Sequence, residues 1–242
     1  MALQHKTQGF VFKKSDVLEA DRVFSVFTRD FGRLEILGKA IRKINSKLRG
    51  NIEIFSFSEI EFIEGKSRKI LTDTLFVKKF KNIASGPEKL RLAYAATDIL
   101  DNFIKGQEKD EKIWNLVTNF FEKLENCKLP ITSHQLIYSY FFWNFISILG
   151  YAPELSHCVL CRQKLNPYTL YFSNQEGGIV CKSCRPSDAP GTKINSDIVK
   201  TIRLMVKGEW EIVSKLKMEK NSQTLFKKIS DDYVNYLKPS YK

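Results

Sequence analysis

Two pairs of cysteines constrain the fold of this 242-residue chain more than any other feature of its sequence. Cys158 and Cys161 form one C-x-x-C pair, Cys181 and Cys184 form another, and the 19 residues 162–180 separate them, which is typical of a zinc ribbon. The intervening segment can run out and back as a hairpin over 169–172 and 177–180. We predict one structural Zn²⁺ per chain, because four thiolates fill its tetrahedral shell and leave no position for water or substrate.

The four paired cysteines have two other possible interpretations, as two disulfides or as part of a catalytic zinc site. Two disulfides would need an oxidising compartment, but the N-terminus has no apolar export segment, so we expect a cytoplasmic protein with reduced thiols. A catalytic zinc deaminase would need a His-x-Glu motif and one C-x-x-C pair that follows a proline. The three histidines, His5, His134 and His157, lie in no such motif. A structural zinc site is therefore the favoured interpretation.

Residues 1–80 have the pattern of a small β-barrel. Apolar residues alternate in five segments that we expect to be strands: 9–12, 22–27, 33–37, 52–63 and 70–80. Asp30-Phe31-Gly32 is typical of a turn between two of them. The alternation slips within 52–63, which predicts bulges in a long, curved strand. Five curved strands in so short a stretch favour a closed barrel of the OB type, although an SH3-like barrel would give a similar pattern.

The rest of the chain is predicted to be helical, with the zinc ribbon inserted. Apolar residues recur at helical spacing in five segments: 92–103, 113–124, 136–148, 198–206 and 225–237. The third is apolar on all sides, so we expect it to be the buried centre of a bundle that ends at Gly150. The predicted fold class is therefore α+β and multidomain. Residues 1–80 form an OB-fold domain and 81–242 an all-α helical domain, with the ribbon at 156–188 and a linker at 187–191.

A run of cations between the third and fourth predicted strands indicates a polyanionic partner. The chain has 39 Lys and Arg against 27 Asp and Glu, a net charge of +12. No acidic residue lies between Glu35 and Glu53, while five cations lie within 39–49: Lys39, Arg42, Lys43, Lys47 and Arg49. In an OB barrel such a loop binds the phosphates of a nucleic acid strand. The alternative is a solvated loop tip.

Short motifs lie at residues 9–12, 19–22, 27–28, 31–34, 38–43, 46–48, 150–155, 158–161 and 181–184. Together they resemble the motifs of the RecO family, the bacterial recombination mediators. The resemblance extends from about residue 8 to the end and is strongest in the barrel and ribbon segments. Two positions depart from the family pattern. Lys39-Ala40 stands where the family often has Gly-Ala, and Arg162 replaces the usual Gly after the second cysteine.

The resemblance implies a DNA repair protein without enzymatic activity. It implies binding to single- and double-stranded DNA, annealing of complementary strands, and action with RecR to place RecA on DNA coated by single-strand DNA-binding protein. Carried over by position, the DNA-contacting candidates are Arg33, Lys39, Arg42, Lys43, Lys47 and Arg49, and the zinc ligands are the same four cysteines. The single-strand binding protein has an acidic, apolar C-terminal tail, which we expect to bind a cation-rimmed groove on the helical domain.

The alternatives from other functional classes are an RNA-binding protein and an enzyme. A zinc-ribbon, OB-fold protein that binds RNA and acts in translation would have the same pattern, because barrel grooves bind both polymers. An enzyme is not expected, since we find no nucleophile motif, no metal-hydrolase motif and no G-x-x-x-x-G-K-[ST] loop. We also expect a cytoplasmic, nucleoid-associated location with no membrane contact.

Overall fold

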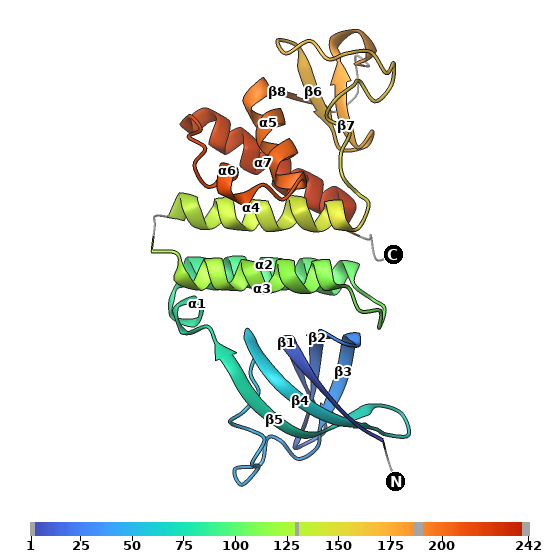
Figure 1. The fold of residues 1–242 in the computed structure, drawn as a ribbon, viewed down its shortest axis with the longest axis vertical. Coiled ribbons are helices and arrows are strands. Elements are labelled where there is room, and N and C mark those ends of the chain that lie inside the picture. Colours follow the sequence, from blue (N-terminus) through green and yellow to red (C-terminus); the bar gives the residue numbers. More distant parts are fainter. Residues whose placement is uncertain (1–2, 129–130, 186–190, 239–242) are drawn as a thin grey trace. The chain divides into compact units, whose positions relative to one another are not determined.

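A computed structural model describes residues 3–128, 131–185 and 191–238. Its contacts divide the chain into two compact units, residues 1–128 and 129–242. Among the described residues, the first unit holds a β-barrel and three α-helices, and the second holds four α-helices, one short 3-10 helix and a small sheet (Figure 1). The structure thus has the predicted fold class, a barrel followed by helices with a four-cysteine module.

Five strands close the barrel: β1 (Gln4–Val17), β2 (Asp21–Thr28), β3 (Gly32–Gly38), β4 (Ser56–Glu64) and β5 (Lys69–Lys79). Their order around the barrel is β1-β2-β3-β5-β4, and all neighbours are antiparallel except β3 and β5. That short parallel contact pairs Ile36 with Lys69 and Leu37 with Ile70. A five-stranded Greek-key barrel closed in this way is an OB-fold.

The fourth strand is shorter than the sequence pattern indicates. It begins at Ser56 rather than Ile52, and the backbone at Phe55 has a φ of +55°. Ile52 is nevertheless buried in the barrel core, so its apolar side chain belongs to a loop that closes the barrel. The β4–β5 register shifts between Phe57 and Ser58 and again between Glu61 and Phe62, but the extra residues, Val77 and Thr72, lie on β5 and not on the strand where the sequence predicts bulges.

Helices α1 (Lys81–Ser85), α2 (Pro87–Phe103) and α3 (Glu111–Asn126) complete the first unit. They lie across one end of the barrel (Figure 1). Aromatic rings fill this contact: Phe10 lies 4.2 Å from Phe121, and Phe57 lies 5.4 Å from Trp114, between ring centroids. The compact unit therefore includes these helices, while the domain boundary at residue 80 stays a prediction.

In the second unit, α4 (Ile131–Ile148), α5 (Ser196–Val206), α6 (Trp210–Val213) and α7 (Lys220–Leu237) pack together. Helix α4 carries five consecutive or near-consecutive side chains with no exposed surface: Phe141, Phe142, Trp143, Phe145 and Ile146. The indole of Trp143 donates a hydrogen bond of 3.0 Å to Ser230 on α7 and stacks on Tyr233 at 5.4 Å. The predicted buried helix is thus the centre of this unit, and Gly150 follows it with a φ of +86°.

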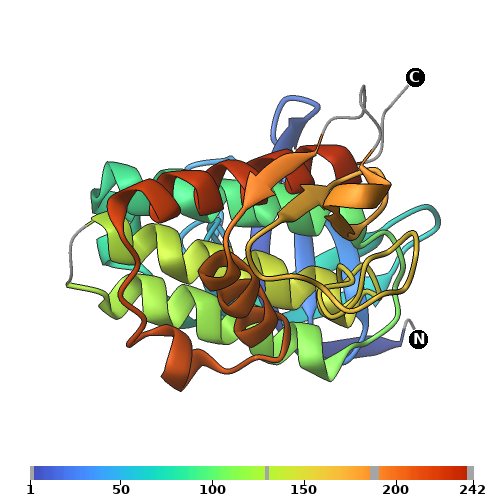
Figure 2. The ribbon, with the colours of Figure 1, turned by 90° about the horizontal axis from the view of Figure 1, so that it is seen from above.

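The predicted hairpin is β6 (Leu170–Ser173) and β7 (Gly178–Cys181), followed by the short helix η1 (Lys182–Cys184). A third strand, β8 (Thr192–Ile194), pairs with the other edge of β6. The sheet lies beside the helices of its unit, as Figure 2 shows in a second view. Residues 186–190 of the predicted linker lie outside the described residues. No helix among the described residues is long and apolar enough to cross a membrane.

Candidate nucleic-acid interface and metal centre

The basic loop, residues 39–55 between β3 and β4, is anchored in the barrel by apolar side chains. Ile41 and Ile52 are buried in the barrel core with Phe24 and Phe62. The start of the loop is also fixed to the β1–β2 turn, because the amide of Ala40 donates to the Asp21 carboxylate at 2.7 Å. Both ends of the loop are thus attached to the barrel. The cationic side chains between these ends are exposed to solvent.

The side chains of four cations of this loop form no hydrogen bond and no ion pair in the described part of the chain. They are Lys39, Lys43, Lys47 and Arg49, and all four are exposed. Arg42 is exposed as well, but its Nε lies 3.3 Å from the Asp16 carboxylate and its Nη1 donates to the Glu19 carbonyl. The side-chain hydrogen bond from Arg22 is the main reason why the pKa of Asp16 is lowered. The loop therefore presents a surface of unpaired positive charge.

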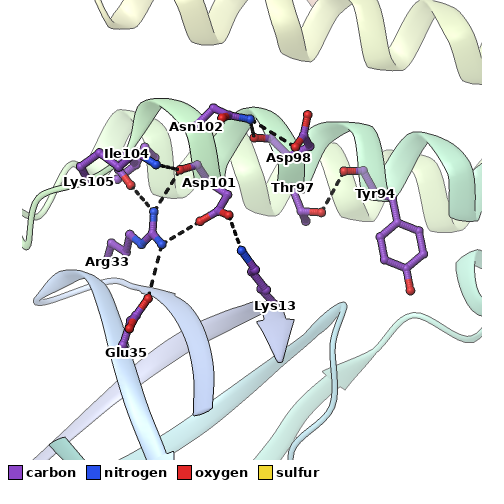
Figure 3. A network of polar contacts seen from close by, with 10 residues as sticks. All are labelled: Lys13, Arg33, Glu35, Tyr94, Thr97, Asp98, Asp101, Asn102, Ile104 and Lys105. Carbon is purple, nitrogen blue, oxygen red and sulfur yellow. Dashed lines mark hydrogen bonds and ion pairs between the residues drawn. The ribbon is translucent and has the colours of Figure 1, made fainter. Parts of the chain in front are cut away.

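Arg33, the remaining DNA-contacting candidate, does not belong to this surface. It lies on β3, and its guanidinium faces α2 with only 13% of the side chain exposed (Figure 3). Its Nη1 donates to the carbonyls of Asp101 and Ile104 at 3.0 and 2.8 Å, and its Nη2 lies 2.7 Å from the Asp101 carboxylate. These contacts occupy the guanidinium within the first unit and set Arg33 apart from the exposed loop cations, while its role as a DNA contact stays a prediction.

A second cation completes this network between barrel and helix. Lys13 on β1 donates to the other oxygen of Asp101 at 2.8 Å, and Glu35 lies 3.6 Å from Arg33. Burial acts to raise the pKa of Asp101, but the hydrogen bond from Lys13 and the charge of Arg33 outweigh it and hold the pKa below its usual range. Asp101 is therefore ionised in the fold at neutral pH and joins two strands to one helix.

The four predicted zinc ligands come together at one point. The sulfurs of Cys158, Cys161, Cys181 and Cys184 all lie within 4.8 Å of one another. Sulfurs at the corners of a tetrahedron, each about 2.3 Å from a central zinc, lie about 3.8 Å apart. The Cys161 and Cys181 sulfurs lie 3.9 Å apart, and all four cysteines are free thiols. The residues present thus fit a tetrahedral metal site.

The electrostatics of this cluster also favour a cation. Burial acts to raise the pKa of Cys158, but amide donors around its sulfur, including the Cys181 amide at 3.4 Å, lower that pKa to about 6. Hydrogen bonds with Cys161 and Cys181 raise the pKa of Cys184 to about 12. Ionisation of one sulfur thus disfavours ionisation of its neighbours, and a cation between the four sulfurs would relieve this repulsion. His157 directly precedes Cys158 in the chain but is exposed and is not part of the cluster.

Comparison with known proteins finds two family models that together match most of the chain. The family model "Recombination protein O N terminal" matches residues 1–80, and "Recombination protein O C terminal" matches residues 85–238. This chain belongs to the RecO family. Among its relatives, the DNA repair protein RecO of a Dehalococcoides mccartyi strain is 31% identical over 215 residues, 89% of this chain and 83% of the relative. The DNA repair protein RecO of Caldanaerobacter subterraneus subsp. tengcongensis is 27% identical and covers 95% of this chain and 91% of its own length.

Membership in the RecO family confirms the resemblance drawn from the sequence motifs. It makes the chain a DNA repair protein of a family with DNA-related partners. Sequence reasoning missed Lys13 and Asp101, which join barrel and helix with Arg33. Asp101 is 68 residues from Arg33 in the chain, and nothing in the spacing of the residues signals their contact.

Proposed function

We propose that this RecO family member is a non-enzymatic, DNA-binding recombination mediator. In this proposal it binds single- and double-stranded DNA, anneals complementary strands, and with RecR helps to load RecA on DNA coated by single-strand DNA-binding protein. It acts in the cytoplasm, at the nucleoid. The observation that carries the proposal is the anchored basic loop, with exposed cations that have no protein partner among the described residues.

The DNA-contacting residues of this proposal are Lys39, Arg42, Lys43, Lys47 and Arg49. Annealing of any complementary pair requires contacts that do not depend on sequence, and cations on a loop supply them by binding phosphates. Three barrel phenylalanines, Phe10, Phe12 and Phe27, are buried and are therefore not available for base stacking. The loop therefore supplies charge, and bases stay free to pair with a second strand.

A comparison of DNA with RNA tests this function against the alternative of a translation-associated RNA-binding protein. Binding of the full chain to matched single-stranded DNA and RNA would be measured, together with annealing of DNA coated by single-strand binding protein. We expect the chain to anneal the coated DNA. Failure to anneal coated DNA, with preference for RNA, would contradict the proposal. Separate pull-downs with RecR and with the single-strand binding protein would test each partner.

For the metal centre we propose a single structural Zn²⁺ held by Cys158, Cys161, Cys181 and Cys184. Zinc would cross-link the two C-x-x-C pairs, because each pair provides two of its four thiolate ligands. Four thiolates leave no open coordination position for a substrate or a reactive water. The hairpin between the knuckles has little core of its own, so metal binding would supply folding free energy to it.

For the acidic tail of the single-strand binding protein we propose a pocket of about 740 Å³ in the second unit. Its floor is apolar, with Pro153, Leu155, Leu165 and Val206, and its cations are Lys164, Arg203 and Lys207. Arg203 donates a hydrogen bond to the Leu155 carbonyl, which fixes the guanidinium at the pocket. A carboxylate and an apolar side chain of one peptide could thus bind together.

Charge reversal tests this pocket. The K164E/K207E variant should bind the tail peptide at least tenfold more weakly, since two rim cations become anions. The K215E/K217E variant is the matched control, because it makes the same charge change on exposed lysines between α6 and α7. Equal loss in both variants would place the tail elsewhere.

A further inference from the structure

The sheet of the zinc ribbon has two different faces. Leu170 and Phe172 on β6 are buried, and the Phe172 ring lies 5.4 Å from Tyr233 and 6.2 Å from Trp143 of the helices. Successive side chains of a strand point to opposite faces, so Tyr171 points away from this core. Lys193 on β8 is its directly paired neighbour and shares its face.

This outer face joins cations to aromatic rings. The guanidinium carbon of Arg185 lies 4.5 Å from the centroid of the Tyr171 ring. Arg185 and Lys193 are exposed, and no hydrogen bond or ion pair of either side chain is found among the described residues. Tyr168, in the turn before β6, has 85% of its surface exposed. We call Tyr171, Arg185 and Lys193, together with Tyr168 of the adjoining turn, the ribbon face.

The surroundings of the ribbon face are depleted of acids. Residues 156–195 contain two acidic residues, Glu176 in the β6–β7 turn and Asp188. The same residues contain five cations: Arg162, Lys164, Lys182, Arg185 and Lys193. A structural metal site needs none of these charges or rings, so the fold alone does not account for them.

We propose that the ribbon face binds a single DNA strand and holds the second strand during annealing, while the basic loop holds the first. This inference rests on the proposed function. An arginine that lies flat on a ring keeps its N–H groups free at the edge, where they match two oxygens of a phosphate. Exposed tyrosines stack on bases without reading sequence, which is the mode of single-strand binding proteins.

Single-stranded DNA fits this face better than an acidic peptide does. Both would be attracted by Arg185 and Lys193, but only a nucleic acid strand brings planar bases at regular intervals for the Tyr168 ring. The apolar pocket suited to a peptide has a different lining, and shares no residue with the ribbon face. The experiment must therefore distinguish binding of a DNA strand to this face from binding of the tail peptide.

The experiment compares full-length R185E/K193E and Y168A with K215E/K217E as the matched control. Each protein is first loaded with one labelled strand, and then the rate of annealing to the complement is measured. We expect first-strand affinity within about twofold of the control and an annealing rate lowered about tenfold in both ribbon variants, because one stacked base or two phosphate contacts are lost. Zinc content and tail-peptide affinity should stay unchanged.

Three outcomes are decisive. Annealing at the control rate in both ribbon variants would overturn the inference, while annealing by the unaltered chain would still support the proposed function. Loss of tail-peptide binding with normal annealing would show a peptide site instead. No annealing by the unaltered chain would mean that the proposed function itself fails. If R185E/K193E loses zinc, Y168A decides, because that side chain is exposed and is no ligand.

Discussion

The guanidinium of Arg33 on β3 lies 2.7 Å from the carboxylate of Asp101 on α2. The contact lies between the barrel and the helix that follows it, and the same guanidinium donates to the Asp101 and Ile104 carbonyls. Arg33 therefore binds the C-terminal end of α2, where unpaired carbonyls and the helix dipole favour a cation. A residue that the family resemblance places among DNA contacts is here part of the packing of the first unit.

Replacement of Arg33 should affect stability more than DNA binding. R33A leaves the Ile104 carbonyl without its donor and removes one of the two cations that bind the Asp101 carboxylate, so we expect a loss of about 2 kcal/mol in the free energy of unfolding of the first unit. K39A should change it by less than about 0.5 kcal/mol, because Lys39 is exposed. Urea unfolding followed by tryptophan fluorescence measures both. A weaker DNA affinity for R33A with normal stability would restore Arg33 as a DNA contact.

Asp101 should make the stability of this unit sensitive to acid. Its pKa in the fold is lower than the value of about 3.9 in unfolded chains. The unfolded chain therefore takes up the proton first, so the stabilisation is present above about pH 4 and is lost as the pH falls through the folded pKa. The difference in unfolding free energy between the unaltered chain and D101N should be largest at pH 6–7 and shrink towards pH 3. A constant difference over this range would show that the charge of Asp101 contributes nothing.

Local patterns in the sequence predict the barrel strands, the long helices and the cysteine cluster. The cysteine spacing is decisive, because each knuckle and the hairpin are formed by neighbouring residues. The start of β4 could not be predicted, since Ile52 alternates as a strand residue would but is buried from a loop. Strand β8 has three residues, too few for any period to appear.

Some residues of the candidate sites could likewise be predicted from the sequence, and others could not. The cations of the basic loop follow from an acid-free run in the chain, and the structure leaves them exposed. The partner of Arg33 depends on how α2 packs on the barrel, which no local pattern encodes. The ribbon face likewise depends on strand pairing, because Arg185, Tyr171 and Lys193 come from three separate segments.

Metal removal should unfold the ribbon and spare the barrel. We expect one zinc per chain and, for C181S, loss of that zinc together with protease sensitivity within 156–185. The barrel shares no ligand with the site, so tryptic fragments that cover residues 1–128 should stay protected. C127S is the matched control, because Cys127 lies outside the cluster. Metal analysis that finds well under one zinc in protein with reduced thiols would contradict the assignment.

The salt dependence of DNA binding tests whether the basic loop binds phosphates. Each phosphate contact on a single strand contributes about 0.7 to the slope of log affinity against log salt. Charge reversal of Lys43 and Lys47 should therefore flatten that slope by about 1.4 and weaken all sequences alike. These two lysines are chosen because Arg42 also pairs with Asp16, and its replacement would disturb the barrel. K109E/K112E, the same charge change on exposed lysines near the start of α3, should leave the slope unaltered. If K43E/K47E keeps the slope of the unaltered chain, the loop is a solvated tip, and the first strand must bind elsewhere.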